Sequence, residues 1–148
     1  MKPKQRILRV VLQIFGVAMI ANGIWMVSRA IQWFFHIPAD MAATGEPNVH
    51  LIRDIGFAYI VFGFALNWCA VRLESRRPVF LMVSFFMVAH ALGHAIEILI
   101  GLLPTSHWWI DFPLVLFPGV FLGTLAIPRV WTSLVNDHAA VNQTGSLL

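Results

Sequence analysis

The chain has 148 residues, of which 59% are hydrophobic and 11% are charged, and its mean hydropathy is +0.77. So few charged residues cannot cover the surface of a soluble globule, and the apolar residues fall into long blocks instead of alternating with polar ones. Composition therefore excludes a soluble domain and predicts an integral membrane protein in contact with the lipid bilayer. The net charge of +3 fits a membrane protein with basic cytoplasmic flanks, so no nucleic-acid partner is expected.

Four apolar blocks are long enough to be membrane-spanning helices, each of which needs roughly 20 mostly apolar residues. In chain order they cover about residues 7–35, 51–71, 79–103 and 112–131. Each block is apolar on all sides, whereas the strands of a membrane barrel alternate, so helices are expected. The predicted fold class is all-α: one membrane domain over residues 1–148, built as a four-transmembrane-helix bundle with a polar tail at 132–148.

The basic residues predict how this bundle is oriented. Eight of the ten Lys and Arg residues lie in the N-terminal flank, in the loop after the second block or at the end of the fourth block: Lys2, Lys4, Arg6, Arg9, Arg72, Arg76, Arg77 and Arg129. The connections at 35–50 and 104–111 contain no Lys or Arg. By the positive-inside rule, the N and C termini, including the tail, are expected to be cytoplasmic. The first block is longer than the core of a signal peptide, so we expect it to be retained.

Small residues, prolines and aromatic residues add expectations about helix packing. Gly119 with Gly123, and Ala89 with Gly93, are small pairs at a spacing of four that favours close approach of helix backbones. Three prolines predict a kinked or locally unwound fourth helix: Pro113, Pro118 and Pro128. Aromatic belts are expected at the outer interface (Trp33, Phe34, Phe35, Trp108, Trp109) and at the inner one (Trp68, Trp131).

The most informative feature of the sequence is a set of polar and ionisable side chains within or beside the apolar blocks. Ionisable groups are costly in lipid and usually bind one another, a ligand or protons. The set lies in the extracytoplasmic half of the predicted bundle and consists of Asn22, His50, Arg53, Asp54, His90, His94, Glu97 and Asp111. Five of the six histidines fall in this half or its loops: His36, His50, His90, His94 and His107.

The spacing of these residues predicts which of them share a helix face. His90, His94 and Glu97 follow one another at intervals of four and three, so they project from one face of the third helix. His50 and Asp54 share a face of the second helix for the same reason. If the two faces meet, they form a His/carboxylate site. The rim and the first helix would add three more polar residues: Arg53, Asp111 and Asn22.

The first hypothesis for this site is a structural, ion-paired network that fixes the register of the bundle. In it, Arg53 pairs with one of three carboxylates, and the histidines form hydrogen bonds between helices. The members expected are Arg53, Asp54, Glu97, Asp111 and Asn22.

The second hypothesis is a transition-metal or haem site, which would make the protein a membrane redox or metal-handling protein. Imidazole suits zinc, copper, iron and nickel, and helical bundles build such sites from His and carboxylates on facing helices. The expected ligands are His90, His94 and Glu97, completed by His50 or Asp54. The pattern lacks the repeated Glu-x-x-His pairs of di-iron bundles.

The third hypothesis is a proton-coupled carrier of a small molecule, or a small-molecule binder. Histidines beside carboxylates are suited to passing protons, and a kinked fourth helix could gate a cavity that opens outward. Four helices leave little room for a transport path within one copy, so a carrier would be a homo-oligomer.

Three segments also carry a resemblance to known proteins: Glu46–Tyr59, His90–His94 and the pair Pro118-Gly119. With these segments the chain resembles small uncharacterised four-helix bacterial membrane proteins and is similar in layout to DoxX-like proteins. The resemblance implies a bacterial inner membrane. Some DoxX-like proteins are linked to sulfur or quinone redox chemistry, but this chain has one cysteine, Cys69, so the resemblance does not carry that chemistry over.

Overall fold

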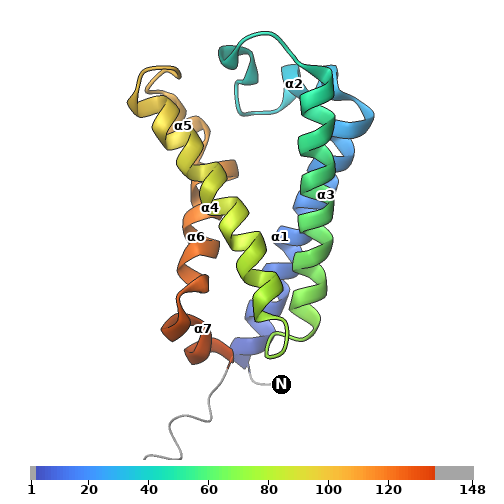
Figure 1. The fold of residues 1–148 in the computed structure, drawn as a ribbon, viewed down its shortest axis with the longest axis vertical. Coiled ribbons are helices and arrows are strands. Elements are labelled where there is room, and N and C mark those ends of the chain that lie inside the picture. Colours follow the sequence, from blue (N-terminus) through green and yellow to red (C-terminus); the bar gives the residue numbers. More distant parts are fainter. Residues whose placement is uncertain (1–2, 136–148) are drawn as a thin grey trace, which may run out of the picture.

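The computed structural model describes residues 3–135, and these residues are all-helical (Figure 1). They form seven α-helices, one 3-10 turn (η1) and one π-helical segment (η2). Their bounds are α1 Pro3–Ser28, α2 Ala30–His36, η1 Met41–Thr44, α3 Val49–Val71, α4 Arg77–Leu99, α5 His107–Ile110, η2 Phe112–Leu116, α6 Phe117–Ala126 and α7 Pro128–Val135. Two predicted features lie outside the described residues: Lys2, and the part of the predicted tail that begins at residue 136.

Within the described residues, α1, α3 and α4 are long and apolar enough to cross a membrane. The segment formed by η2 and α6 makes a fourth candidate span together with α7, although α7 is bent away from it by 77°. The prediction of an all-α protein with three to four candidate membrane spans is therefore confirmed for the described residues.

The first predicted block is broken at Arg29, which separates α1 from α2. Arg29 has φ −140° and ψ 54°, outside the helical region. Just before it, the Ser28 hydroxyl donates to the Ile24 carbonyl at 2.6 Å, a local bond that often accompanies a bend in a helix. The predicted helix over 7–35 is thus two helices. The second of them, α2, buries its own set of side chains: Ala30, Trp33 and Phe34.

The fourth predicted block is also interrupted, as its prolines predict. Pro113 lies in the π-helical turn η2, Pro118 is in the first turn of α6, and Pro128 begins α7 after the bend. Proline lacks the amide hydrogen needed in a helix interior, so each interruption falls where that hydrogen is missing. The bend leaves α7 beside the start of α1, where Gln5 Nε2 donates to the Val135 carbonyl at 2.7 Å.

Four glycines bring α1 and α3 into backbone contact. A Cβ at Gly23 would lie 2.5 Å from the Gly56 carbonyl oxygen, and one at Gly63 would lie 2.6 Å from the Gly16 carbonyl oxygen. Both separations are too short for a side chain. Each helix carries its two glycines seven residues apart, which is two turns, so they form one continuous seam between antiparallel helices.

Helices α4 and α6 also approach each other closely at two glycines, which are four residues apart. A Cβ at Gly119 would lie 2.5 Å from the Ala91 Cβ, and one at Gly123 would lie 2.8 Å from Val88 Cγ2. The predicted close approach at Gly119 and Gly123 is therefore present. The pair Ala89 and Gly93 makes no such contact, because both residues are exposed and a Cβ at Gly93 would meet nothing within 4 Å among the described residues.

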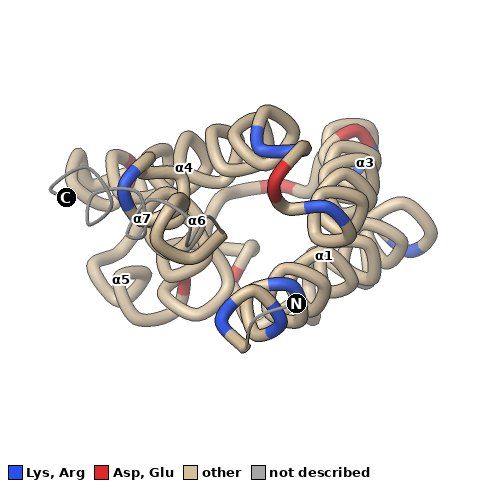
Figure 2. Tube along the Cα trace, turned by 90° about the horizontal axis from the view of Figure 1, so that it is seen from below, with Lys and Arg blue, Asp and Glu red and all other residues tan. Residues whose placement is uncertain are grey.

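The two helix pairs converge at one end of the molecule and separate towards the other (Figure 1). The convergent end carries the N-terminus, the loop between α3 and α4, and α7; we call it the basic end, because most of the Lys and Arg residues gather there (Figure 2). We call the opposite end the open end. The main core joins both pairs towards the basic end, and its members include Leu12, Leu66, Phe80, Met87, Leu122 and Trp131.

At the open end the buried apolar cluster involves α1, α2 and α3 and does not extend to the other pair. It consists of Met26, Ala30, Trp33, Phe34 and Ile52. The exposed fractions of Trp33 and Phe34 are 6% and 4%, so these two residues are core residues and not part of an interfacial belt. The prediction was wrong for them because the break at Arg29 rotates α2 onto α3. The pairs are thus joined at one end and lack a shared apolar core at the other.

The Arg9 side chain caps the C-terminal end of α3, which lies at the basic end of the molecule. Its Nε and Nη2 donate to the carbonyls of Ala70 and Val71 at 2.9 Å and 2.8 Å, where a helix has no amide partners for its last carbonyls. We expect Arg9→Gln to lower the free energy of unfolding by about 1 kcal/mol, because two bonds from a charged donor are lost at a partly exposed position. Arg6→Gln on the exposed side of α1 is the matched control. Equal chemical-unfolding midpoints for the two variants in detergent would contradict the assignment.

Candidate functional site

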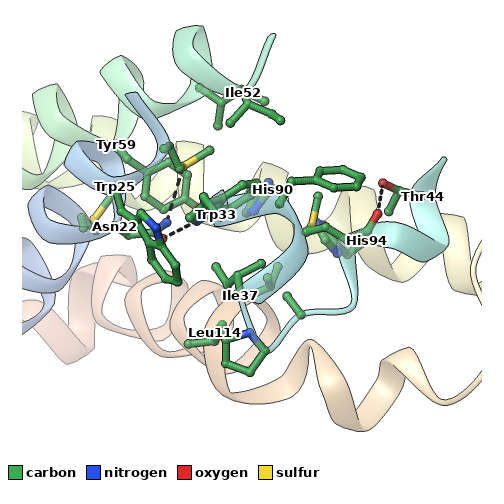
Figure 3. A pocket seen from close by; sticks show the side chains of 18 of the residues that line it. Asn22, Trp25, Trp33, Ile37, Thr44, Ile52, Tyr59, His90, His94 and Leu114 are labelled. Carbon is green, nitrogen blue, oxygen red and sulfur yellow. Dashed lines mark hydrogen bonds between the residues drawn. The ribbon is translucent and has the colours of Figure 1, made fainter. Parts of the chain in front are cut away.

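A cavity of about 560 Å³ lies between the two helix pairs towards the open end (Figure 3). One wall comes from α1, α2 and α3, and the other from α4, η2 and α6. Segment 37–48, which connects α2 to α3, supplies further wall residues. The surface of the cavity is mainly aromatic and aliphatic, and its large members include Phe15, Met19, Trp25, Trp33, Tyr59 and Met87. The cavity therefore occupies the region where the pairs share no apolar core.

A small number of polar groups reach this cavity. On the α1 side, the Asn22 amide oxygen accepts a hydrogen bond from Trp33 Nε1 at 2.8 Å (Figure 3). This bond holds α2 against α1 across the helix break. On the α4 side, His90 and His94 line the cavity, and their ring centroids are 4.8 Å apart. His90 also lies edge-on to Tyr59 with ring centroids 6.1 Å apart.

Behind His94 lies a buried carboxylate that binds two imidazoles. Asp111, at the junction of α5 and η2, is fully buried. Its Oδ2 lies 2.8 Å from His94 Nδ1, and both of its oxygens lie 3.3 Å from His107 Nδ1. His107 is 1% exposed, and it meets Asp111 because the two residues are four apart in one helical stretch. These contacts fasten α5 and η2 to α4.

The network extends towards the other helix pair through the far nitrogen of His107. His107 Nε2 lies 3.9 Å from Asp40 Oδ2 and has no hydrogen-bond partner among the described residues. Asp40 is on segment 37–48 and has a left-handed backbone with φ 44°, which is uncommon for a residue other than glycine. The contact spans the separation between the pairs, from a cavity-lining segment to the buried network.

The structure does not bring the α3 residues of the predicted site to this place. His50 and Asp54 pair with each other at 3.4 Å, and their side chains are 88% and 57% exposed. They point away from the bundle because the glycine seam with α1 occupies the other side of α3. Arg53 is also exposed, and its Nε donates to the Val27 carbonyl at 3.3 Å; it forms no ion pair with a carboxylate within residues 3–135.

Only two of the three site residues predicted on the third helix face the cavity. His90 and His94 face the cavity, whereas Glu97 is exposed near the end of α4. Of the carboxylates expected in the ion-paired network, Asp111 is the one that binds a cavity histidine, His94. Within residues 3–135, no group of three or more His, Cys, Asp or Glu side chains could hold a metal ion.

Sequence reasoning missed two members of the site. His107 binds Asp111 inside the protein, and the i,i+4 spacing of these two residues was the signal for it. Trp33 lines the cavity and donates to Asn22. No sequence signal marked Trp33, because its inward direction depends on the break between α1 and α2.

Comparison of the chain with protein families, with curated proteins and with solved structures gave no match. The resemblance to DoxX-like proteins therefore rests on the quoted sequence segments alone.

Proposed function

We propose that the protein is a four-span membrane bundle that binds a small, largely apolar molecule in the cavity between its two helix pairs. In this arrangement η2, α6 and α7 form the fourth span and its surface turn. The basic end and both termini are cytoplasmic by the positive-inside rule, so the cavity lies in the extracytoplasmic half. The resemblance in layout favours a bacterial inner membrane.

The observation that carries the binding proposal is the cavity itself. Ligand sites typically have volumes of about 300–1,000 Å³, mainly apolar walls and a few convergent polar groups. The volume of about 560 Å³ and the aromatic and thioether walls fit this description. The polar residues of the wall are Asn22, His90 and His94 on the helices, and Thr44, Glu46 and Asn48 on segment 37–48. Helix pairs that served only as a scaffold would gain more stability by packing against each other along their whole length.

The histidine–aspartate network supports the same proposal by holding one cavity wall in place. Asp111 ties α4 to α5 and η2, and η2 contributes wall residues such as Val115. Part of the structural, ion-paired hypothesis is therefore kept: the network acts as a scaffold for the site. It is built from histidines and Asp111, and Arg53 and Glu97 take no part in it.

The proposal predicts that a bulky side chain inside the cavity displaces the bound molecule. We expect Ala18→Trp, which lies in the cavity wall on α1, to abolish retention of a small molecule. The matched control is Val17→Trp, one position away and 59% exposed on the outside of the same helix. The measurement is mass spectrometry of small molecules that remain with the protein after extraction from its source membrane into lipid nanodiscs.

A molecule present at close to one per protein in the native form and in Val17→Trp, and absent from Ala18→Trp, is the expected result. Equal retention in both variants would contradict a site in this cavity. Elemental analysis of the same samples addresses the metal hypothesis, since a stoichiometric transition metal lost in His94→Ala would favour that hypothesis instead.

A further inference from the structure

Asp111 determines which nitrogen of His94 is available to a ligand. A carboxylate is purely an acceptor, and its Oδ2 lies 2.8 Å from His94 Nδ1, so Nδ1 carries the hydrogen of this bond. A neutral imidazole has one N–H, and its second nitrogen is then an acceptor. In the neutral form of His94, the buried carboxylate therefore fixes the tautomer and the ring orientation and leaves Nε2 as an acceptor, in the way that carboxylates orient histidines elsewhere.

His94 presents this acceptor to the cavity. Its side chain is 18% exposed, and the residue is part of the cavity wall, whereas Asp111 behind it is fully buried. The neighbouring titratable groups are His90 at the same wall, Tyr59 across from it on α3, and His107 on the far side of Asp111. Asp111 fixes the hydrogen-bonding direction of both His94 and His107, and of these two His94 is the one in the cavity wall.

We propose that the molecule bound in the cavity carries a hydroxyl or N–H donor at one end, and that this donor is hydrogen-bonded to His94 Nε2. This inference rests on the proposed binding function and specifies its ligand class: a mainly apolar molecule with one polar donor end, such as an alkylphenol. The apolar part lies along the aromatic walls that include Trp25 and Trp33. The donor end reaches the part of the α4 wall that holds His90 and His94.

Binding of a molecule without a donor is disfavoured by the same wall of α4. Burying an acceptor without a partner costs free energy, because the hydrogen bond to water is lost and not replaced. A ligand that lacks the donor leaves His94 Nε2 in that state when it fills the cavity. The preference for a donor is therefore a property of His94 and Asp111, whereas the apolar walls accept either kind of molecule.

The test compares two probes that differ in the donor alone. 4-Octylphenol has a phenolic O–H, and in 4-octylanisole that hydrogen is replaced by a methyl group. Saturable binding to the protein in nanodiscs is measured by equilibrium dialysis, with partition into empty nanodiscs subtracted. We expect the native protein to bind the phenol about tenfold more tightly, a difference of about 1.4 kcal/mol.

The variant His94→Phe should remove the preference by weakening phenol binding to the level of the anisole. His90→Phe is the matched control one turn away on the same wall, and it should keep a preference for the phenol. Because His94→Phe also deprives Asp111 of a partner, a second measurement uses the native protein. Nitrogen NMR of the protein labelled in histidine should show a His94 imidazole protonated at Nδ1 and unprotonated at Nε2.

Three results would overturn the inference. The first is equal affinity for the two probes with both excluded by Ala18→Trp, which would leave the proposed binding function standing. The second is no saturable binding of either probe; the proposed function is then judged separately by the molecule retained from the source membrane. The third is a proton on Nε2 of His94 in the empty protein.

Discussion

Replacement of Asp111 by alanine is expected to lower the free energy of unfolding by about 3 kcal/mol. The carboxylate is the shared partner of two buried or mostly buried imidazoles, His94 and His107. Each buried donor left without an acceptor costs about 1–3 kcal/mol, and both would be left at once. The measurement is reversible chemical unfolding in detergent, followed by circular dichroism.

Asp54→Ala is the control for the Asp111 variant. Asp54 also pairs with a histidine four residues away, but both side chains are largely exposed, and such pairs contribute little to stability. Asp111→Asn keeps one acceptor oxygen and should lie between the native protein and Asp111→Ala. Similar unfolding curves for Asp54→Ala and Asp111→Ala would show that the buried network does not hold the open end together.

The second large effect is expected at the glycine seam. Gly63→Ala should destabilise the protein by about 1–3 kcal/mol, because an added methyl group cannot be accommodated without moving the packed helices. A Cβ at this position would lie 2.6 Å from a carbonyl oxygen of α1, so backbone atoms block the space. The same unfolding experiment measures the loss.

Gly93→Ala provides the matched control for this seam. Gly93 lies within α4, and a Cβ there would meet no described atom within 4 Å. Alanine is favoured over glycine in a helix by about 1 kcal/mol, so this variant should be as stable as the native protein or more stable. Destabilisation by Gly93→Ala equal to that by Gly63→Ala would point to a general cost of side chains at these glycines and contradict the seam.

Much of the fold was predictable because helices in a membrane must be long and apolar. The second and third predicted blocks, 51–71 and 79–103, fall close to α3 and α4 as observed. The prolines also marked the interruption of the fourth block. The break at Arg29 was not predicted, since one polar pair, Ser28 and Arg29, interrupts an otherwise apolar run and hydropathy averages over it.

The orientation of α3 could have been read from its glycines. Gly56 and Gly63 are seven residues apart and therefore lie on one face, which is the face that packs on α1. At 3.6 residues per turn, His50 and Asp54 fall on the opposite side of the helix. The sequence therefore carried a reason to expect these two residues outside the bundle, and the charge pattern alone did not reveal it.

The location of the site, by contrast, depends on contacts between segments far apart in the chain. Spacing placed His90 and His94 on one helix face, and counting along α4 placed them towards the extracytoplasmic end. The sequence could not show that Asp111 is the carboxylate behind His94, because that contact joins α4 to the start of η2 across 17 residues. It could not reveal the cavity either, which arises from the separation of two helix pairs.

The most direct test of the account is a cryo-electron microscopy structure of the protein in nanodiscs made from its source membrane, with a bound antibody fragment to aid alignment. We expect the pairs α1–α3 and α4–α6 to separate at the open end, and non-protein density to fill the cavity beside His94. A map in which side chains close the space between the pairs along their full length would contradict it.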